Sequence, residues 1–110
     1  GNPQISERYD PLSPAILSLF SSLARQCDEA GVPFSLCGEM AASPLDAMAL
    51  IGAGLRNLSM APNAIGPVKA MVRSLSVEDL TGYMQTLYAS PKHSLRGILH
   101  AFAKDHGVAV

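Results

Sequence analysis

Cys37 has the clearest capacity for chemistry of any side chain in this sequence. It ends the apolar segment 32–37 and is followed by Gly38 and Glu39, with a helix expected a few residues later. Parallel α/β enzymes place catalytic residues at such a strand end. A thiol there can be a nucleophile only if a neighbouring base generates the thiolate. The alternative, a small apolar core residue, is the commoner role when spacing alone is considered.

The neighbours of Cys37 favour proton donation over nucleophilic attack. The histidines, His93, His100 and His106, all follow residue 90, and no sequence signal places one of them beside the thiol. The carboxylate of Glu39 is expected to keep the thiol protonated, because a nearby negative charge disfavours the thiolate. An unperturbed thiol, with a pKa of about 8.5, is mainly protonated at neutral pH and can give up a proton.

The other polar candidates have common structural roles. Cys27 occupies the apolar face of an expected helix and is predicted to lie in the core. Ser59 and Asn63 follow a second apolar segment, where turn and capping roles are commoner than a place in a pocket. Glu39 can be a ligand or hydrogen-bond partner beside the strand end, or a helix-terminal or solvated charge. The sequence has no glycine-rich phosphate loop, zinc spacing or paired-carboxylate motif, so these residues alone leave the function open.

The elements that must position Cys37 alternate between helices and short strands. Helices are predicted to begin at Ser13-Pro14, Ser43-Pro44 and near Gly66-Pro67; the first two combine an N-cap hydroxyl with proline at the first helical position. The apolar segments 32–37 and 57–60 are typical of parallel strands that are buried on both faces. This order predicts a parallel sheet with crossover helices.

Two further amphipathic helices are predicted in the tail, one capped by Ser76 and one that starts at Ser90-Pro91 and ends at Gly107. The predicted inward faces of the first and third helices consist of Ile16, Leu19, Phe20, Leu23 and Cys27, and of Val68, Met71, Val72 and Leu75. Two strands do not form a stable open sheet, and a complete (β/α)₈ barrel needs roughly 250 residues. We therefore expect an α/β fold in which residues 1–75 are the C-terminal portion of such a barrel and residues 76–110 are helices that pack on it.

Composition narrows the classes of function. Apolar residues make up 48% of the chain and charged residues 15%. This balance indicates either that the chain shares a large interface with another protein or that it is a piece of a larger domain. In both cases we expect the isolated chain to self-associate. The formal net charge is −1 and the Lys and Arg residues are scattered, so nucleic-acid binding is not expected. No apolar run is long enough for a membrane span. Two cysteines do not make a disulfide framework, so a reduced, cytoplasmic location is the expectation.

Several ordered motifs resemble the C-terminal end of enzyme I, the phosphoenolpyruvate–protein phosphotransferase family. These motifs are Cys37-Gly38-Glu39-Met40-Ala41, Leu50-Ile51-Gly52-Ala53-Gly54, Leu58-Ser59-Met60-Ala61-Pro62 and Val68-Lys69-Ala70-Met71-Val72-Arg73. The likeness runs from residue 1 to about residue 75 and is closest to the nitrogen-related branch. Pyruvate phosphate dikinase and phosphoenolpyruvate synthase share the Cys-Gly-Glu signature and are the alternative families.

The resemblance implies a fold and a reaction. In that family a (β/α)₈ barrel binds phosphoenolpyruvate (PEP) and Mg²⁺ and forms a homodimer. The phosphoryl group passes to a histidine of another domain and on to a phosphocarrier protein, leaving enolpyruvate. The cysteine that matches Cys37 protonates carbon C3 of enolpyruvate to give pyruvate, with Gly38 and Glu39 expected in substrate binding or in support of the thiol.

Two departures from the family pattern matter. Ala42-Ser43 stands where the family commonly has Gly-Asp, which changes the support of the thiol, although Ser43 can still cap the next helix. The family's Mg²⁺ ligands, phosphate-binding arginines and phosphorylated histidine all precede the matched segment. A site without its metal and charge clamps loses most of its transition-state stabilisation, so this chain alone is expected to be inactive. The alternative from a different class is a non-catalytic helical interaction module in which Cys37 is a core residue.

Overall fold

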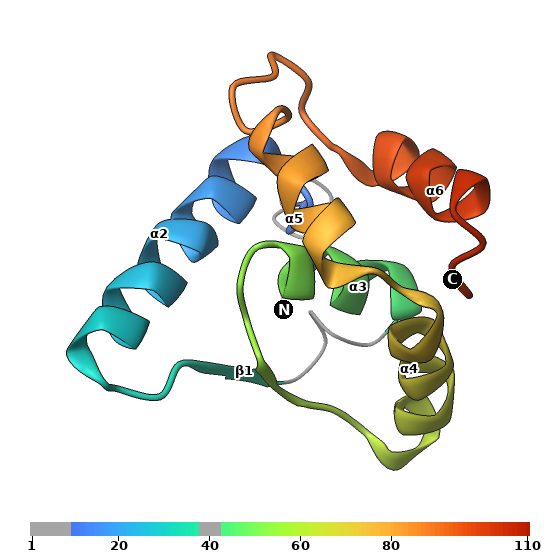
Figure 1. Cartoon of the computed structure of the whole chain (residues 1–110), viewed down its shortest axis with the longest axis horizontal. Helices are drawn as coiled ribbons and strands as arrows, with labels where there is room; N and C mark the ends of the chain where they lie inside the picture. Colours follow the sequence, from blue (N-terminus) through green and yellow to red (C-terminus); the bar gives the residue numbers. More distant parts are fainter. Residues whose placement is uncertain (1–9, 38–42) are drawn as a thin grey trace, which may run out of the picture.

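Seven elements run through residues 10–37 and 43–110, which are the residues that the computed structural model describes. In chain order they are α2 (Pro14–Ala30), β1 (Ser35–Cys37), α3 (Pro44–Gly52), β2 (Asn57–Ser59), α4 (Pro62–Ser74), α5 (Val77–Gln85) and α6 (Arg96–Asp105). Figure 1 shows α3 near the middle of the molecule, with the other helices arranged around it. The predicted α/β class is confirmed, while closure into a (β/α)₈ barrel stays a prediction.

The two strands form a parallel pair joined through α3, as the alternating pattern predicted. Leu36 pairs with Leu58, and both side chains are half-buried against the core. The prediction that both faces are buried is wrong, because Ser35, Asn57 and Ser59 are exposed. In the described part of the chain, helices cover only the face of the strand pair that carries Leu36 and Leu58. Both strands are also shorter than the apolar segments 32–37 and 57–60 in which they were predicted.

Three serines cap helices as their spacing predicted. The hydroxyl oxygens of Ser13, Ser43 and Ser76 each accept a hydrogen bond from the backbone N–H three residues later, at 3.2, 3.2 and 3.3 Å. Each bond satisfies an N–H that has no partner within its helix. These caps fix where α2, α3 and α5 begin.

The third helix begins earlier than predicted. α4 starts at Pro62, which occupies its first helical position, and not near Gly66-Pro67. A proline at the first position loses nothing, because the N–H there has no helical partner. Pro67 lies inside the helix and is tolerated in its second turn, where it removes one backbone hydrogen bond.

The last helix begins later than predicted, at Arg96 and not at Ser90-Pro91. The backbone N–H of Leu95 donates to the carbonyl of Leu12 at 2.8 Å, and the Ser94 hydroxyl accepts from the N–H of Arg96 at 3.1 Å. The start of α6 is therefore set by a contact with the distant segment before α2. Nothing in the local sequence around residue 90 could indicate this contact.

The core lies around α3, which contacts α2, α4, α5 and α6. Residues 47–50 of α3 are fully buried. Two residues of the predicted inward faces are exposed instead: Leu19 is 55% and Val72 is 42% accessible. Leu17 takes the buried position on α2, and Cys27 is half-buried and not a core residue. No helix in the part of the chain described here is long and apolar enough to cross a membrane.

Candidate functional site

The site predicted from the sequence lies at the carboxyl edge of the strand pair. Cys37 ends β1 and is the register partner of Ser59, which ends β2. Because the strands are parallel, both of their carboxyl ends lie at this edge. Gly38 and Glu39 lie outside the described residues, and Cys37 is described in its backbone only. Ser59 and Asn63 are both exposed, with Asn63 in the first turn of α4.

A second feature lies where the chain enters α3, six residues after Cys37. The hydroxyl of Ser43 donates to Asp46 Oδ2 at 2.8 Å, while the backbone N–H of Asp46 donates to Ser43 Oγ at 3.2 Å. The two residues thus hold each other across the first turn of α3. Asp46 also places a negative charge at the positive end of the helix dipole, which is favourable there.

An ion-pair network joins this helix start to two distant segments. The guanidinium of Arg96 lies 2.9 Å from Asp46 Oδ1 through Nη1, and Nη2 donates to Asp10 Oδ1 at 3.2 Å. Asp10 Oδ1 also accepts from the N–H of Leu12 at 2.9 Å. We call Arg96, Asp10 and Asp46 the Arg96 bridge. It connects the segment before α2, the first turn of α3 and the first turn of α6.

The charges of the bridge support one another. Burial works against the charged form of Arg96, but the carboxylates of Asp46 and Asp10 outweigh it and raise the pKa of the guanidinium. Burial also raises the pKa of Asp10, yet hydrogen bonds from Ser94 and Leu12 together with Arg96 reverse the effect, so the pKa of Asp10 is lowered. Arg96 and Asp10 are consequently charged at neutral pH.

Sequence reasoning missed the Arg96 bridge. Asp10 and Arg96 are 86 residues apart, and no spacing rule connects them. The signal that was available is the Ser43 to Asp46 spacing, since a cap residue followed three positions later by an acidic residue marks a helix start. That signal locates Asp46 but not its partner on α6.

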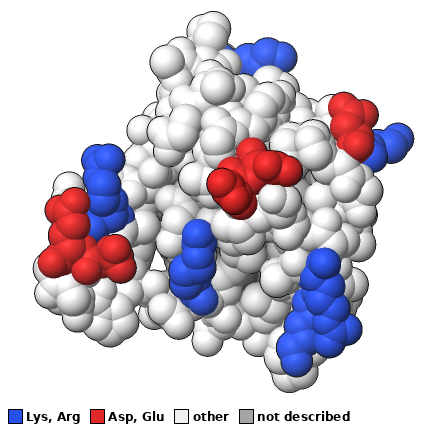
Figure 2. Space-filling view, in the orientation of Figure 1, with Lys and Arg blue, Asp and Glu red and all other residues white. Residues whose placement is uncertain are grey.

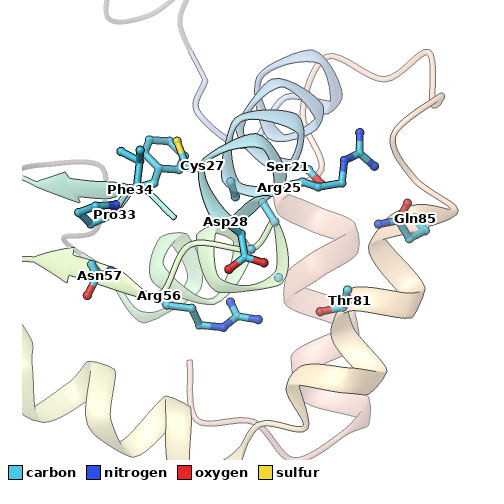
Figure 3. Close-up of a pocket in the computed structure, with 15 residues that line it drawn as sticks. Ser21, Arg25, Cys27, Asp28, Pro33, Phe34, Arg56, Asn57, Thr81 and Gln85 are labelled. Atoms are coloured by element: carbon cyan, nitrogen blue, oxygen red, sulfur yellow. The ribbon is translucent and has the colours of Figure 1, made fainter. Parts of the chain in front are cut away.

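A groove of about 490 Å³ lies at the opposite ends of the strands. Figure 3 shows it between α2, the segment before β1, the start of β2 and α5, with Pro33, Phe34 and Asn57 in its wall. Arg56 Nη1 donates to the carbonyls of Ile51 and Leu55 at 2.8 and 2.9 Å and so caps the end of α3. Since parallel α/β enzymes carry their chemistry at the carboxyl ends of the strands, this groove is not the candidate site.

The histidines lie on the tail, away from both strands in the chain. His100 is on α6, and His106 follows that helix and stacks on Phe102 with ring centroids 3.9 Å apart. His93 lies in the connection before α6, not on a helix as predicted. Across residues 10–37 and 43–110, no group of three or more His, Cys, Asp or Glu side chains could hold a metal ion.

The surface seen in Figure 2 is mostly uncharged. Acidic and basic side chains lie on it in small, separate groups. This face therefore offers no continuous basic surface of the kind that binds a nucleic-acid backbone.

The parallel pair with a cysteine at its carboxyl edge is typical of an α/β enzyme domain. Residues 1–77 match the family model described as "PEP-utilising enzyme, PEP-binding domain". The match covers more than half of the chain, and the chain belongs to this family. α6 and nearly all of α5 lie beyond the matched residues.

Individual relatives agree with this assignment. The chain is 34% identical over 108 residues to a Salmonella typhimurium protein named "Phosphoenolpyruvate-dependent phosphotransferase system", which covers 97% of this chain and 14% of the relative. It is 40% identical over 76 residues to the phosphoenolpyruvate-protein phosphotransferase of Cupriavidus necator, covering 69% of this chain and 13% of the relative. The corresponding Borreliella burgdorferi protein is 34% identical over 80 residues, which are 73% of this chain and 14% of the relative. The chain thus spans about one-seventh of the length of these relatives.

Proposed function

We propose that this chain is the C-terminal portion of the PEP-binding barrel of a phosphoenolpyruvate–protein phosphotransferase. The observation that carries the proposal is the family match over residues 1–77 together with the parallel β1–α3–β2 unit, whose first strand ends at Cys37. In a (β/α)₈ barrel this unit would be two consecutive strands with their connecting helix, and its carboxyl edge would face the substrate. Two relatives that carry the name phosphoenolpyruvate-protein phosphotransferase support this proposal.

In this proposal Cys37 is the proton donor. When the phosphoryl group leaves PEP for a histidine nitrogen, the bond between phosphorus and the enol oxygen breaks and enolpyruvate remains. The enol oxygen keeps the negative charge after phosphoryl transfer, so this species is an enolate. The thiol gives its proton to carbon C3 of the enolate, which becomes pyruvate, and the thiolate regains a proton from water. Gly38 and Glu39 would bind substrate or support the thiol. β1 and β2 carry no histidine that could serve as a base for Cys37.

Mg²⁺ belongs to the expected reaction, but the described residues do not fit it. Asp10 and Asp46, the carboxylates that gather near the start of α3, are already paired with Arg96. No other group of candidate ligands occurs in residues 10–37 and 43–110. We therefore assign no step of the reaction to a metal held by these residues.

The proposed partners follow from the same reaction. PEP is the substrate, pyruvate the product and a phosphocarrier protein the phosphoryl acceptor, and the protein acts as a homodimer in the cytoplasm. Assignment to the nitrogen-related branch is part of the proposal. The exposed apolar side chains Leu19, Val32 and Val72 are consistent with surfaces that further protein covers.

The direct experiment uses the full-length gene product with Mg²⁺ and ³²P-labelled PEP. We expect acid-labile phosphohistidine and pyruvate to form in equal amounts, and the label to move to the phosphocarrier protein of the same organism. The 110-residue chain in the same assay should form neither product. Pyruvate that appears only with AMP and pyrophosphate would instead indicate a dikinase, and absence of reaction with PEP would overturn the proposal.

A further inference from the structure

A groove of about 500 Å³ lies between α5 and α6, the orange and red helices of Figure 1. Its lining includes Asp79 and Tyr83 from α5, and Ile98, Phe102, Asp105 and His106 from α6 and the residue after it. All of these residues lie beyond the family-matched residues 1–77, so the family match assigns the groove nothing. The groove is a surface of the tail, and we call it the α5–α6 groove.

Three stacked aromatic rings lie in the α5–α6 groove. The ring of Phe102 stacks on those of Tyr83 and His106, with centroid distances of 5.1 and 3.9 Å and interplanar angles of 15° and 21°. Phe102 is only 7% exposed, whereas Tyr83 and His106 are both exposed. The stack is therefore anchored in the core by its Phe102 ring and leaves aromatic surface open to solvent at its other two members.

The charged and polar atoms of the groove are mostly acceptors. Asp79 and Asp105 are exposed, and among residues 10–37 and 43–110 neither forms an ion pair with a basic side chain. His106 Nδ1 lies 2.9 Å from the carbonyl oxygen of Phe102. Because a carbonyl only accepts, Nδ1 donates, and Nε2 of the neutral ring is left as an acceptor. Among the residues that the structure describes, no Lys or Arg lines the groove.

A guanidinium group is the chemical complement of this lining. Its planar face stacks on aromatic rings, and its five N–H donors bond carboxylates in a fixed fork. A lysine ammonium has the charge but neither the flat face nor the fork. An anion would face two carboxylates, and a purely apolar segment would cover them without giving them a hydrogen-bond partner.

A second copy of the chain does not suit the groove. In a two-fold symmetric dimer the same patch lies on both sides of the interface. Two copies that met at this groove would therefore bring Asp79 and Asp105 of one protomer towards the same carboxylates of its partner, and like charges across an interface are disfavoured. A different protein that brings positive charge satisfies the lining better.

We propose that the α5–α6 groove is a docking surface for a partner protein that inserts an arginine from a basic segment. The guanidinium lies against the exposed aromatic surface and donates to the carboxylates of Asp79 and Asp105. Ile98 packs on the methylene stem of the arginine, as apolar side chains do with such stems. The surface takes no part in the reaction at Cys37, so the inference stands apart from the proposed function.

The test uses the full-length gene product and a short glycine–serine peptide that carries two arginines and a fluorescent label. One matched peptide has citrulline in place of arginine, which keeps the planar shape without the charge. A second has lysine, which keeps the charge without the fork. Binding is followed by fluorescence polarisation at low salt, where charge pairs on a surface are least screened. An arginine peptide with a photoreactive group locates the binding site by cross-linking and mass spectrometry.

Three variants separate the groove from general surface charge. Asp105→Asn removes one carboxylate of the groove, and Tyr83→Leu removes one ring of the stack. Glu29→Gln is the matched control, because it also removes an exposed carboxylate from the last turn of a helix, α2, but outside the groove. Negative charge opposes the helix dipole at both of these helix ends, so neither Asp105→Asn nor Glu29→Gln should lower stability.

We expect the arginine peptide to bind at least about fivefold more tightly than the citrulline peptide, with the lysine peptide in between. Asp105→Asn should weaken binding of the arginine peptide by about fivefold or more, and Tyr83→Leu by about threefold or more. Glu29→Gln should change it by less than about twofold. The cross-links should fall on the peptides that contain α5 and α6.

Equal binding of the arginine and citrulline peptides would overturn the proposal, as would equal effects of Asp105→Asn and Glu29→Gln or cross-links confined to other segments. Absence of binding would also overturn it. In that case, protection of Tyr83 from hydroxyl radicals in the protein alone would show that the protein itself covers the groove, and loss of this protection on dilution would identify a second copy as the occupant.

Discussion

Gly52 gives the sharpest prediction about how the tail packs on the rest of the chain. It is the last residue of α3 and is buried at the contact with α5. A methyl group built on Gly52 would lie 2.8 and 2.9 Å from Cδ2 and Cγ of Leu80 and would also overlap Met84 Sδ. Leu80 and Met84 are themselves fully buried, so neither can move aside into solvent. In Gly52→Ala, α3 and α5 must therefore separate or repack.

The magnitude follows from two opposing terms. Replacing glycine by alanine in a helix gains at most about 1 kcal/mol, and less at a final helical residue. Overpacking a close-packed core costs about 1–3 kcal/mol, and contact with two fully buried side chains places Gly52→Ala near the upper end. We expect the free energy of unfolding to fall by about 2 kcal/mol. The matched control is Gly82→Ala on α5, where an added methyl group meets no atom within 4 Å and should stabilise the chain slightly.

The assay is urea unfolding of the 110-residue chain, followed by the circular dichroism of its helices. All variants are compared at one protein concentration, because association would shift the apparent stability. A lower urea midpoint for Gly52→Ala, with an unchanged or higher midpoint for Gly82→Ala, is the expected pair of results. A Gly52→Ala chain at least as stable as the parent would refute the close contact between α3 and α5.

Two other predictions concern acid stability and association. The pKa of Asp10 is lowered on folding, so its contribution to stability is complete above its ordinary pKa of 3.8 and is lost as the pH falls through the lower folded value. In thermal melting from about pH 6 to about pH 2.5, the melting temperature of Asp10→Asn should therefore fall less steeply than that of the parent chain. An equal fall of the melting temperature in both chains would contradict this. The exposed side chains Leu19, Val32 and Val72 predict concentration-dependent association of the 110-residue chain in sedimentation velocity. A concentration-independent monomer with cooperative unfolding would count against a part of a larger barrel.

Local signals in the sequence were sufficient for most of the elements. Ser13, Ser43 and Ser76 mark helix starts because a cap bonds an N–H only three residues away, and so the signal and its partner are adjacent in sequence. The parallel pairing of β1 and β2 followed from the alternation of strands and helices. The family was recognisable from ordered motifs, of which the segment beginning at Cys37 is the most specific.

Other features depend on contacts that no local pattern encodes. The start of α6 is set by the bond from Leu95 to Leu12, and the bridge pairs Arg96 with carboxylates far away in the sequence. Pro62 was ambiguous for a different reason, since proline both ends elements and begins helices. The burial of a strand face depends on what packs over it, which the composition of β1 and β2 alone does not determine.

The most direct test of Cys37 as the proton donor is the fate of enolpyruvate in Cys37→Ala, with Cys27→Ala as the matched control. Cys27 is half-buried and lines the groove at the opposite ends of the strands. In rapid-quench experiments on the full-length gene product with PEP, we expect Cys37→Ala still to form phosphohistidine at the parent rate. Pyruvate should then appear only as fast as free enolpyruvate ketonises in solution, while Cys27→Ala behaves like the parent. Pyruvate formation in Cys37→Ala that keeps pace with phosphohistidine would contradict the role of Cys37 as the proton donor.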